Sequence, residues 1–152
     1  EYFDDHVLSC GLTYSGHPLA CAAGVACVNY YEEANIIPHV KEMGKVLSAR
    51  LEAFKSAHAC VGDVRCIGLF SAIEFVKNKS TKEPLVPYGR DPKGTMGMII
   101  RLLKERRFMT YSHENMILIA PPLIITEEQL TEELEKVEEV LTIVDSRLEE
   151  LA

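Results

Sequence analysis

Residues 62–76 read GDVRCIGLFSAIEFV and predict a β-hairpin, around which the rest of the fold is arranged. Apolar residues recur at alternate positions on both sides of Gly68, as in half-buried β-strands. Glycine adopts backbone angles that other residues resist, so we expect two short strands with a tight bend or a bulge at Gly68. Glu74 lies within the second strand. Because a carboxylate on a half-exposed strand usually faces water, we assign it no catalytic role.

The segments after the hairpin complete a small sheet. Residues 77–90 are polar and contain prolines, which predicts a loop, and Asp91 followed by Pro92 predicts the start of a helix. Strands are expected near residues 108–111 and over residues 116–120, with a turn between them. Two prolines end the last strand, because neither can donate a hydrogen bond to a ladder. These segments predict a small, mainly antiparallel sheet.

Amphipathic helices flank the predicted sheet. Apolar residues at helical spacing predict one helix from Asn35, as its N-cap, to about Ala57. Thr126 and Gln129 predict a capping box at the start of the final helix. The apolar stripe of that helix would also suit a coiled coil, but we expect it to dock on the core of its own domain. The stripe consists of Leu130, Leu134, Val137, Leu141, Val144, Leu148 and Leu151.

The N-terminal part begins with a different pattern. Residues 11–18 read GLTYSGHP and lead into a run of small apolar residues. Thr13 or Ser15 can cap exposed backbone amides, and Pro18 suits the first position of a helix. A helix start of this kind presents unpaired N–H groups and the positive end of the helix dipole, which attract a phosphate or a carboxylate. From these features alone, we favour an ordinary capped helix start.

Composition narrows the class of protein. The 152 residues suit one domain, and their net charge of −7 provides no basic surface for nucleic acid or for an anionic membrane. No apolar run approaches the length of a membrane span, and no secretion leader is evident. The five cysteines lack C-x-x-C spacing and the histidines lack metal-ligand spacing, so we expect reduced thiols in a cytoplasmic protein and no metal site. Residues 1–5 read like the middle of a longer protein.

Three stretches together resemble the class III aminotransferases, which use pyridoxal 5'-phosphate (PLP). Residues 11–23 are similar to the segment that follows the cofactor lysine in that family. Residues 62–76 are similar to its first small-domain hairpin, and residues 115–126 are similar to its last strand and turn. The three matches occur in the family's order and cover nearly the whole chain. We therefore identify the chain as a member of this family.

The resemblance implies an α+β fold, as in the C-terminal domain of fold type I PLP enzymes. That domain has a small, mainly antiparallel sheet packed on one side by helices and preceded by a long helical segment. By this resemblance, residues 1–34 form the cofactor-phosphate loop and linking helix, normally packed on the large domain. Residues 35–152 form the small C-terminal domain. Thr13, together with the backbone of Leu12, would contact the PLP phosphate of the neighbouring subunit.

The resemblance also implies that the chemistry needs residues outside this chain. In the family, the lysine that holds PLP precedes the Thr13 segment, yet no lysine precedes Lys41 here. The aspartate that pairs with the pyridine nitrogen also belongs to the missing N-terminal large domain. We therefore expect a piece of a homodimeric aminotransferase that transfers an amino group from an amine or amino acid to a 2-oxo acid. This piece has no assigned catalytic residue and should be inactive alone.

The substrate end of the resemblance is incomplete. Many family members carry a carboxylate-binding arginine on or just before the last strand, but Tyr111 and Leu118 occupy those places here. The amino donor therefore stays open among α-amino acids, ω-amino acids, amines and amino sulfonates. Two alternatives to an enzyme fragment also stay open: a stand-alone interaction module, and an anion-binding module that uses the helix start near Pro18.

Overall fold

The computed structural model describes residues 2–11 and 13–151, and the chain divides into two compact units. The first unit is Glu1–Ile36 and the second is Ile37–Ala152. The functional division that we placed between residues 34 and 35 stays a prediction. Among the described residues, no helix is long and apolar enough to cross a membrane.

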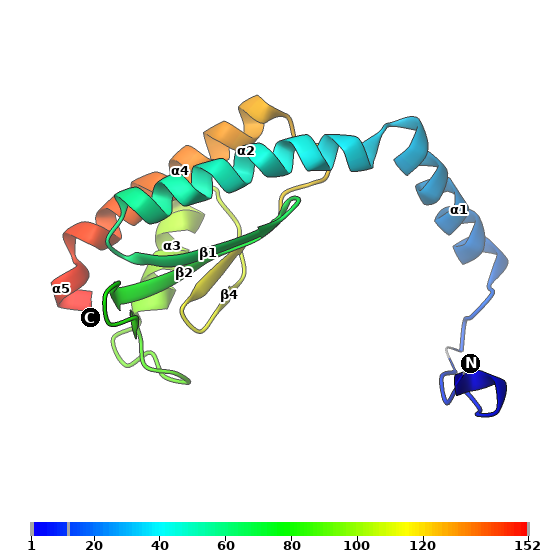
Figure 1. The fold of residues 1–152 in the computed structure, drawn as a ribbon, viewed down its shortest axis with the longest axis horizontal. Helices are drawn as coiled ribbons and strands as arrows, with labels where there is room; N and C mark the ends of the chain where they lie inside the picture. The colour runs from blue at the N-terminus through cyan, green and yellow to red at the C-terminus, as the bar shows by residue number, and fades with distance from the viewer. Residues whose placement is uncertain (1, 12, 152) are drawn as a thin grey trace. The chain divides into compact units, whose positions relative to one another are not determined.

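The first unit consists of a short 3₁₀ helix and one long α-helix. The 3₁₀ helix η1 spans Tyr2–Asp4, and α1 spans Pro18–Glu33, as the sequence predicted (Figure 1). Asn35 follows the end of α1 with φ of 50°, which is the left-handed conformation that asparagine tolerates after a helix. The next helix, α2 (Ile36–Ala57), begins directly after Asn35, so Asn35 lies where the sequence predicted the N-cap, but with a left-handed rather than an extended backbone.

The second unit contains an antiparallel sheet in the strand order β1-β2-β5-β4, with β3 paired to β2 (Figure 1). Gly68 has φ of 58° and lies in the tight turn between β1 and β2. The register shift lies between Val61 and Asp63 instead, so Gly68 makes the bend and not a bulge. The strands are β1 Val61–Ile67, β2 Phe70–Asn78, β3 Glu83–Pro84, β4 Ser112–His113 and β5 Met116–Ile119.

Two boundaries after the hairpin differ from the prediction. No strand forms at residues 108–111; the strand β4 lies at Ser112–His113, where we expected a turn. Glu114 takes φ of 51° in a turn of two residues, 114–115, which is shorter than the turn that we expected. The residues that pair with β5 are therefore Ser112 and His113, directly before this turn. The helix α3 spans Thr95–Glu105, three residues later than expected. Asp91 still caps it, since its carboxylate accepts hydrogen bonds from the backbone N–H groups of Thr95 at 2.7 Å and Met96 at 3.0 Å.

Three helices form the core with one face of the sheet. The helix α2 spans Ile36–Ala57, and α4 spans Glu127–Ser146, followed by the short α5 at Leu148–Leu151. The capping box of Thr126 and Gln129 is present as predicted. The five residues of the predicted stripe that lie in α4 are buried in the core of its own unit, which confirms that this helix docks there rather than forming a coiled coil. Leu148 and Leu151 lie in the separate α5 and are only partly buried, so the final helix is shorter than predicted. The buried residues of α4 are Leu130, Leu134, Val137, Val140, Leu141 and Val144.

The sheet is covered on one face only, as predicted. Ile73 and Phe75 of β2, with Ile117 and Ile119 of β5, are buried in the core that α2, α3 and α4 share. The residues between them point to the other face, which we call the open face; Phe70 there is 59% exposed. Strand register places Asp63, Arg65, Ile67, Phe70, Ala72, Glu74, Met116 and Leu118 on the open face.

Asp145 lies in α4, and its carboxylate forms hydrogen bonds with the connection between α2 and β1. It accepts hydrogen bonds from Nδ1 of His58 and from the backbone N–H of Cys60, both at 2.8 Å. Burial alone would raise the pKa of Asp145, but its bonds with Cys60 and His58 outweigh burial and hold the pKa below its ordinary value of 3.8. Burial also raises the pKa of the Cys60 thiol, so Cys60 stays protonated and serves as a core residue.

The depressed pKa of Asp145 predicts acid-sensitive stability. Above the unfolded-state pKa the carboxylate stabilises the folded unit, and this contribution is lost as pH falls through the lower folded-state pKa. Asp145→Asn should therefore lower the free energy of unfolding at pH 7. The difference in this free energy between the variant and wild type should shrink as the pH falls toward 3. Urea unfolding followed by circular dichroism between pH 7 and pH 3 measures this. A difference that stays constant across that range would contradict the role of Asp145.

Candidate cofactor-phosphate site

The loop before α1 folds as a turn that leaves the helix start uncapped by any side chain. Gly16 takes φ of 74°, and the N–H of His17 donates to the carbonyl of Tyr14 at 3.1 Å. His17 is the N-cap residue, and Pro18 follows as the first helical residue, as predicted. The His17 side chain does not cap α1, and no side chain among residues 2–11 and 13–151 is recorded as bonded to its N-terminal amides. Capping by Thr13 or Ser15, which we expected, is therefore wrong.

The uncapped start leaves hydrogen-bond donors available. The first N–H group with a helical hydrogen bond is that of Cys21, which donates to the carbonyl of His17 at 2.9 Å. The N–H groups of Leu19 and Ala20 come before it and therefore have no partner within the helix. Thr13 is exposed and makes no side-chain hydrogen bond to another described residue. The Thr13 hydroxyl, five residues before Pro18, and the N-terminal N–H groups of a helix of 16 residues are donors of the kind that a phosphate accepts from. The predicted contact by Leu12 lies outside the described residues.

The donors of this loop are neutral. No lysine or arginine occurs before Lys41, so the loop offers hydroxyl and N–H groups rather than a side-chain cation. Tyr14 and His17 lie beside each other, with ring centroids 6.3 Å apart in an edge-on arrangement. These neutral donors can hold an anion.

The two positions singled out at the substrate end lie side by side. The N–H of Leu118 donates to the carbonyl of Tyr111 at 2.9 Å, and the hydroxyl of Thr110 donates to the carbonyl of Leu118. Leu118 belongs to the open face, and Tyr111 is 64% exposed. Two nearby arginines are paired elsewhere, Arg106 with Glu139 at 2.8 Å and Arg101 with Glu105 at 4.0 Å, whereas Arg107 is exposed. Tyr111 and Leu118 thus contribute a phenolic and an apolar side chain to the same part of the sheet.

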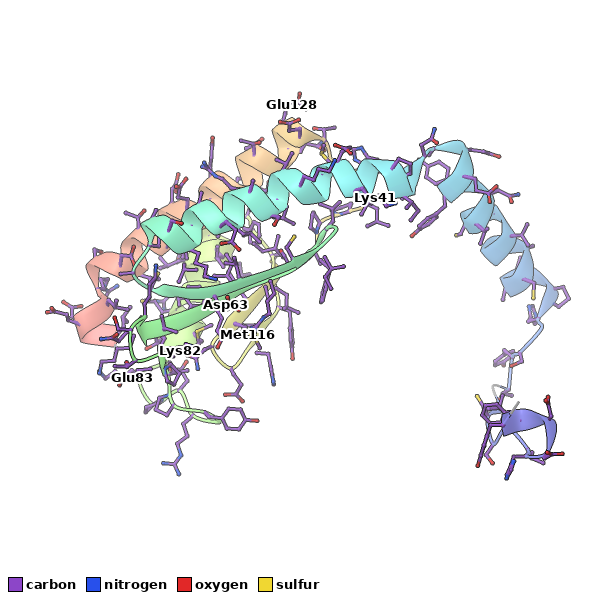
Figure 2. The ribbon with its side chains drawn as sticks, viewed as in Figure 1. Lys41, Asp63, Lys82, Glu83, Met116 and Glu128 are labelled. Carbon is purple, nitrogen blue, oxygen red and sulfur yellow. The ribbon has the colours of Figure 1, made fainter. Side chains whose placement is uncertain are left out.

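Arg65 of β1 connects the two strands of the hairpin on the open face. Its guanidinium lies on the open face, 2.6 Å from the carboxylate of Glu74 and 3.8 Å from that of Asp63. It also contacts the sulfur of Met116 at 2.9 Å; Figure 2 labels Asp63 on β1 and Met116 on β5. Only the strand register identifies Glu74 as its partner, which no local sequence signal showed. Among the described residues, no group of His, Cys, Asp or Glu could hold a metal ion.

The same arrangement of loop, helix and sheet is found in known proteins. The family described as class III aminotransferases matches residues 4–141. The chain belongs to this family. A solved structure of similar fold is taurine:2-oxoglutarate aminotransferase from Bifidobacterium kashiwanohense, determined in complex with PLP and glutamate. It is 56% identical, superposes with a TM-score of 0.87, and matches 97% of this chain and 33% of its own.

Two curated relatives have a lower sequence identity to this chain than that solved structure. A probable mitochondrial γ-aminobutyrate transaminase 3 of Oryza sativa subsp. indica is 32% identical, over 93% of this chain and 27% of its own length. The ethanolamine-phosphate phospho-lyase homolog 1 of Caenorhabditis elegans is also 32% identical, over 88% of this chain and 28% of its own. This class III chain therefore spans about a quarter to a third of the proteins that it matches.

Proposed function

We propose that this chain is the C-terminal domain of a PLP-dependent aminotransferase that moves an amino group from an amino sulfonate such as taurine to 2-oxoglutarate. One observation carries the proposal: the chain is 56% identical, over 97% of its length, to the taurine:2-oxoglutarate aminotransferase from Bifidobacterium kashiwanohense. Its identity to other solved transaminases is 29% and 32% over comparable lengths. A homodimer located in the cytoplasm is part of this proposal.

The loop before α1 is proposed to hold the phosphate of PLP. The Thr13 hydroxyl and the free N–H groups at the start of α1 would donate to it, and the backbone of Leu12 would add a further contact. When bound, PLP supplies the electron sink for amino transfer. The lysine that anchors PLP and the aspartate beside its ring belong to the part of the protein outside this chain. Residues 1–152 alone should therefore not catalyse.

The open face of the second unit is proposed to border a surface that binds the substrate. Leu118 and Tyr111 meet there, at the two places where many members of the family carry a carboxylate-binding arginine. Arg65 is a cation on the open face, and its guanidinium is already paired with the carboxylate of Glu74 at 2.6 Å. The positive charge that binds the sulfonate or carboxylate of the substrate would come from the exposed Arg107 or from outside this chain. In this chain, Tyr111 offers one phenolic hydroxyl as a neutral hydrogen-bond donor.

The full-length protein tests both the activity and the role of Thr13. Wild type should keep PLP through dialysis and form glutamate from taurine and 2-oxoglutarate. Thr13→Ala should raise the Kd for PLP by about 10- to 100-fold, since one hydrogen bond to a charged group is worth about 1.5–3 kcal/mol. Activity at limiting PLP should fall accordingly, and saturating PLP should restore it. PLP fluorescence titration and a glutamate-release assay measure the two effects.

Ser15→Ala is the matched control, because Ser15 is an exposed hydroxyl residue of the same loop with no part in the proposed site. It should bind PLP like wild type. If Thr13→Ala also binds PLP like wild type, the phosphate role of Thr13 is wrong while the activity can still stand. If wild type forms no glutamate from taurine but does so from γ-aminobutyrate, the donor is wrong. If it forms none from any amino donor, the aminotransferase proposal fails.

A further inference from the structure

The turn that follows β5 has few hydrogen-bond donors of its own. Its first two residues, Pro121 and Pro122, have no backbone N–H group, and the turn closes through the N–H of Ile125, which donates to the carbonyl of Pro122 at 3.0 Å. The helical hydrogen bonds of α4 begin at the carbonyl of Thr126, so they do not use the carbonyl of Ile125. Because Ile125 is 7% exposed, that carbonyl needs a partner from elsewhere in the fold.

His39 of α2 supplies this partner. Its Nε2 lies 2.8 Å from the carbonyl oxygen of Ile125, and since a carbonyl oxygen only accepts, Nε2 carries the proton. The helix itself is fixed nearby, because Gly44 approaches the backbone of Gly68 in the hairpin turn too closely to admit a side chain. Figure 1 shows the connection between β5 and α4 passing beside the first turns of α2. His39 therefore connects the turn to a helix whose position on the sheet is fixed.

The turn continues directly from the surface that is proposed to bind the substrate. Leu118 of β5 lies beside Tyr111 and belongs to the open face. The end of β5 and the turn also line an apolar cavity of about 700 Å³, to which Met109, Leu118 and Ile124 contribute. A shift of the turn away from α2 would therefore move the end of β5 and the residues beside it.

We propose that His39 is a positioning residue of the aminotransferase, which holds the carbonyl of Ile125 and thereby keeps the end of β5 in place for binding of the amino donor. This inference rests on the proposed function, and it assigns His39 an action through the turn rather than a contact with the substrate. The loss of such a residue weakens substrate binding without removing a reacting group. It should therefore raise KM for the amino donor and leave kcat and the Kd for PLP near their wild-type values.

Two substitutions that keep an amide N–H donor but differ in length test the role of His39 in the full-length protein. In His39→Gln the side-chain nitrogen reaches about as far as Nε2, whereas in His39→Asn it reaches only about as far as Nδ1. Lys41→Asn, at an exposed position of the same helix, controls for the weaker helix propensity of asparagine. Circular dichroism confirms that each variant is folded before its activity is measured.

We expect His39→Asn to raise KM for taurine by at least about 5-fold in the glutamate-release assay, because a buried carbonyl loses its partner. His39→Gln and Lys41→Asn should stay within about 2-fold of wild type, since the first keeps the hydrogen bond and the second does not involve it. Hydrogen exchange followed by mass spectrometry reports on the turn without any substrate. Peptides that cover residues 123–125 should exchange faster in His39→Asn and like wild type in His39→Gln.

A taurine KM in His39→Asn equal to that of wild type would overturn the inference. Equal increases in His39→Asn and His39→Gln would also overturn it, because the donated hydrogen bond would then not be the cause, and so would a rise in the Kd for PLP that matches the rise in KM. If wild type uses another amino donor, the KM values for that donor decide the inference in the same way. Failure of wild type to form glutamate from any amino donor would instead reject the proposed function, and this inference with it.

Discussion

Asn115→Ala is expected to lower the free energy of unfolding of the second unit by about 3 kcal/mol, because it leaves two buried backbone groups unpaired. The side-chain Oδ1 of Asn115 accepts from the N–H of Val86 at 2.7 Å, and its Nδ2 donates to the carbonyl of Val86 at 2.8 Å. Asn115 is 8% exposed and Val86 is 4% exposed, so water does not replace the lost bonds. Urea unfolding followed by circular dichroism measures the change.

Asn78→Ala is the matched control for Asn115. The Asn78 side chain also accepts two backbone hydrogen bonds, from Ser80 at 2.8 Å and Thr81 at 3.2 Å, but these groups are exposed. Water can replace its bonds, so the loss should stay below about 1 kcal/mol. The loop around Val86 should also exchange its amide protons faster in Asn115→Ala. Equal destabilisation by the two substitutions would show that Asn115 does not hold this loop.

Gly44→Ala is expected to destabilise the second unit by about 2 kcal/mol, although alanine favours helices. A methyl group at Gly44 would lie 2.8 Å from the Cα and the carbonyl oxygen of Gly68, in the turn of the β1–β2 hairpin. Gly68 has a left-handed backbone, with φ of 58°, and the atoms that the methyl group would meet are backbone atoms rather than the end of a flexible side chain. Overpacking of this kind costs about 1–3 kcal/mol or more, which exceeds the gain of about 1 kcal/mol from replacing a helical glycine.

Gly97→Ala provides the comparison of opposite sign. Gly97 lies in α3, and a methyl group there would meet no atom within 4 Å. This substitution should therefore stabilise the unit by about 0.5–1 kcal/mol. Thermal and urea unfolding of both variants measure the two changes. If Gly44→Ala also stabilises the unit, α2 does not approach the hairpin turn as closely as the structure shows.

Local sequence patterns predicted most of the elements of this fold. The hairpin bend at Gly68, the capping box of Thr126 and Gln129, and the Pro18 start of α1 are recognisable because each depends on residues within one turn of chain. The prediction failed where distant pairing decided the outcome. Residues 108–111 have strand-like composition, yet the register with β5 places β4 at Ser112–His113.

The candidate site shows the same division. The sequence singled out Thr13 as the phosphate residue through resemblance, but it predicted a capped helix start, and the start of α1 has no side-chain cap. It singled out Tyr111 and Leu118 as separate positions, and only the sheet shows that Leu118 donates a hydrogen bond to Tyr111 at 2.9 Å. Capping depends on where a side chain points, which the residue type alone does not specify.

The amino-acid sequence by itself determined the family of this protein, its helices and hairpin, and the residue types that face the core, because periodicity and turn chemistry act between near neighbours. The tertiary structure decided which face of the sheet stays open, that Glu74 is the partner of Arg65, and that Asn115 holds Val86. It also formed the apolar cavity beside Met109 and Ile124. These features join residues that are far apart in the chain, and their contacts form only when strand register and helix packing bring them together.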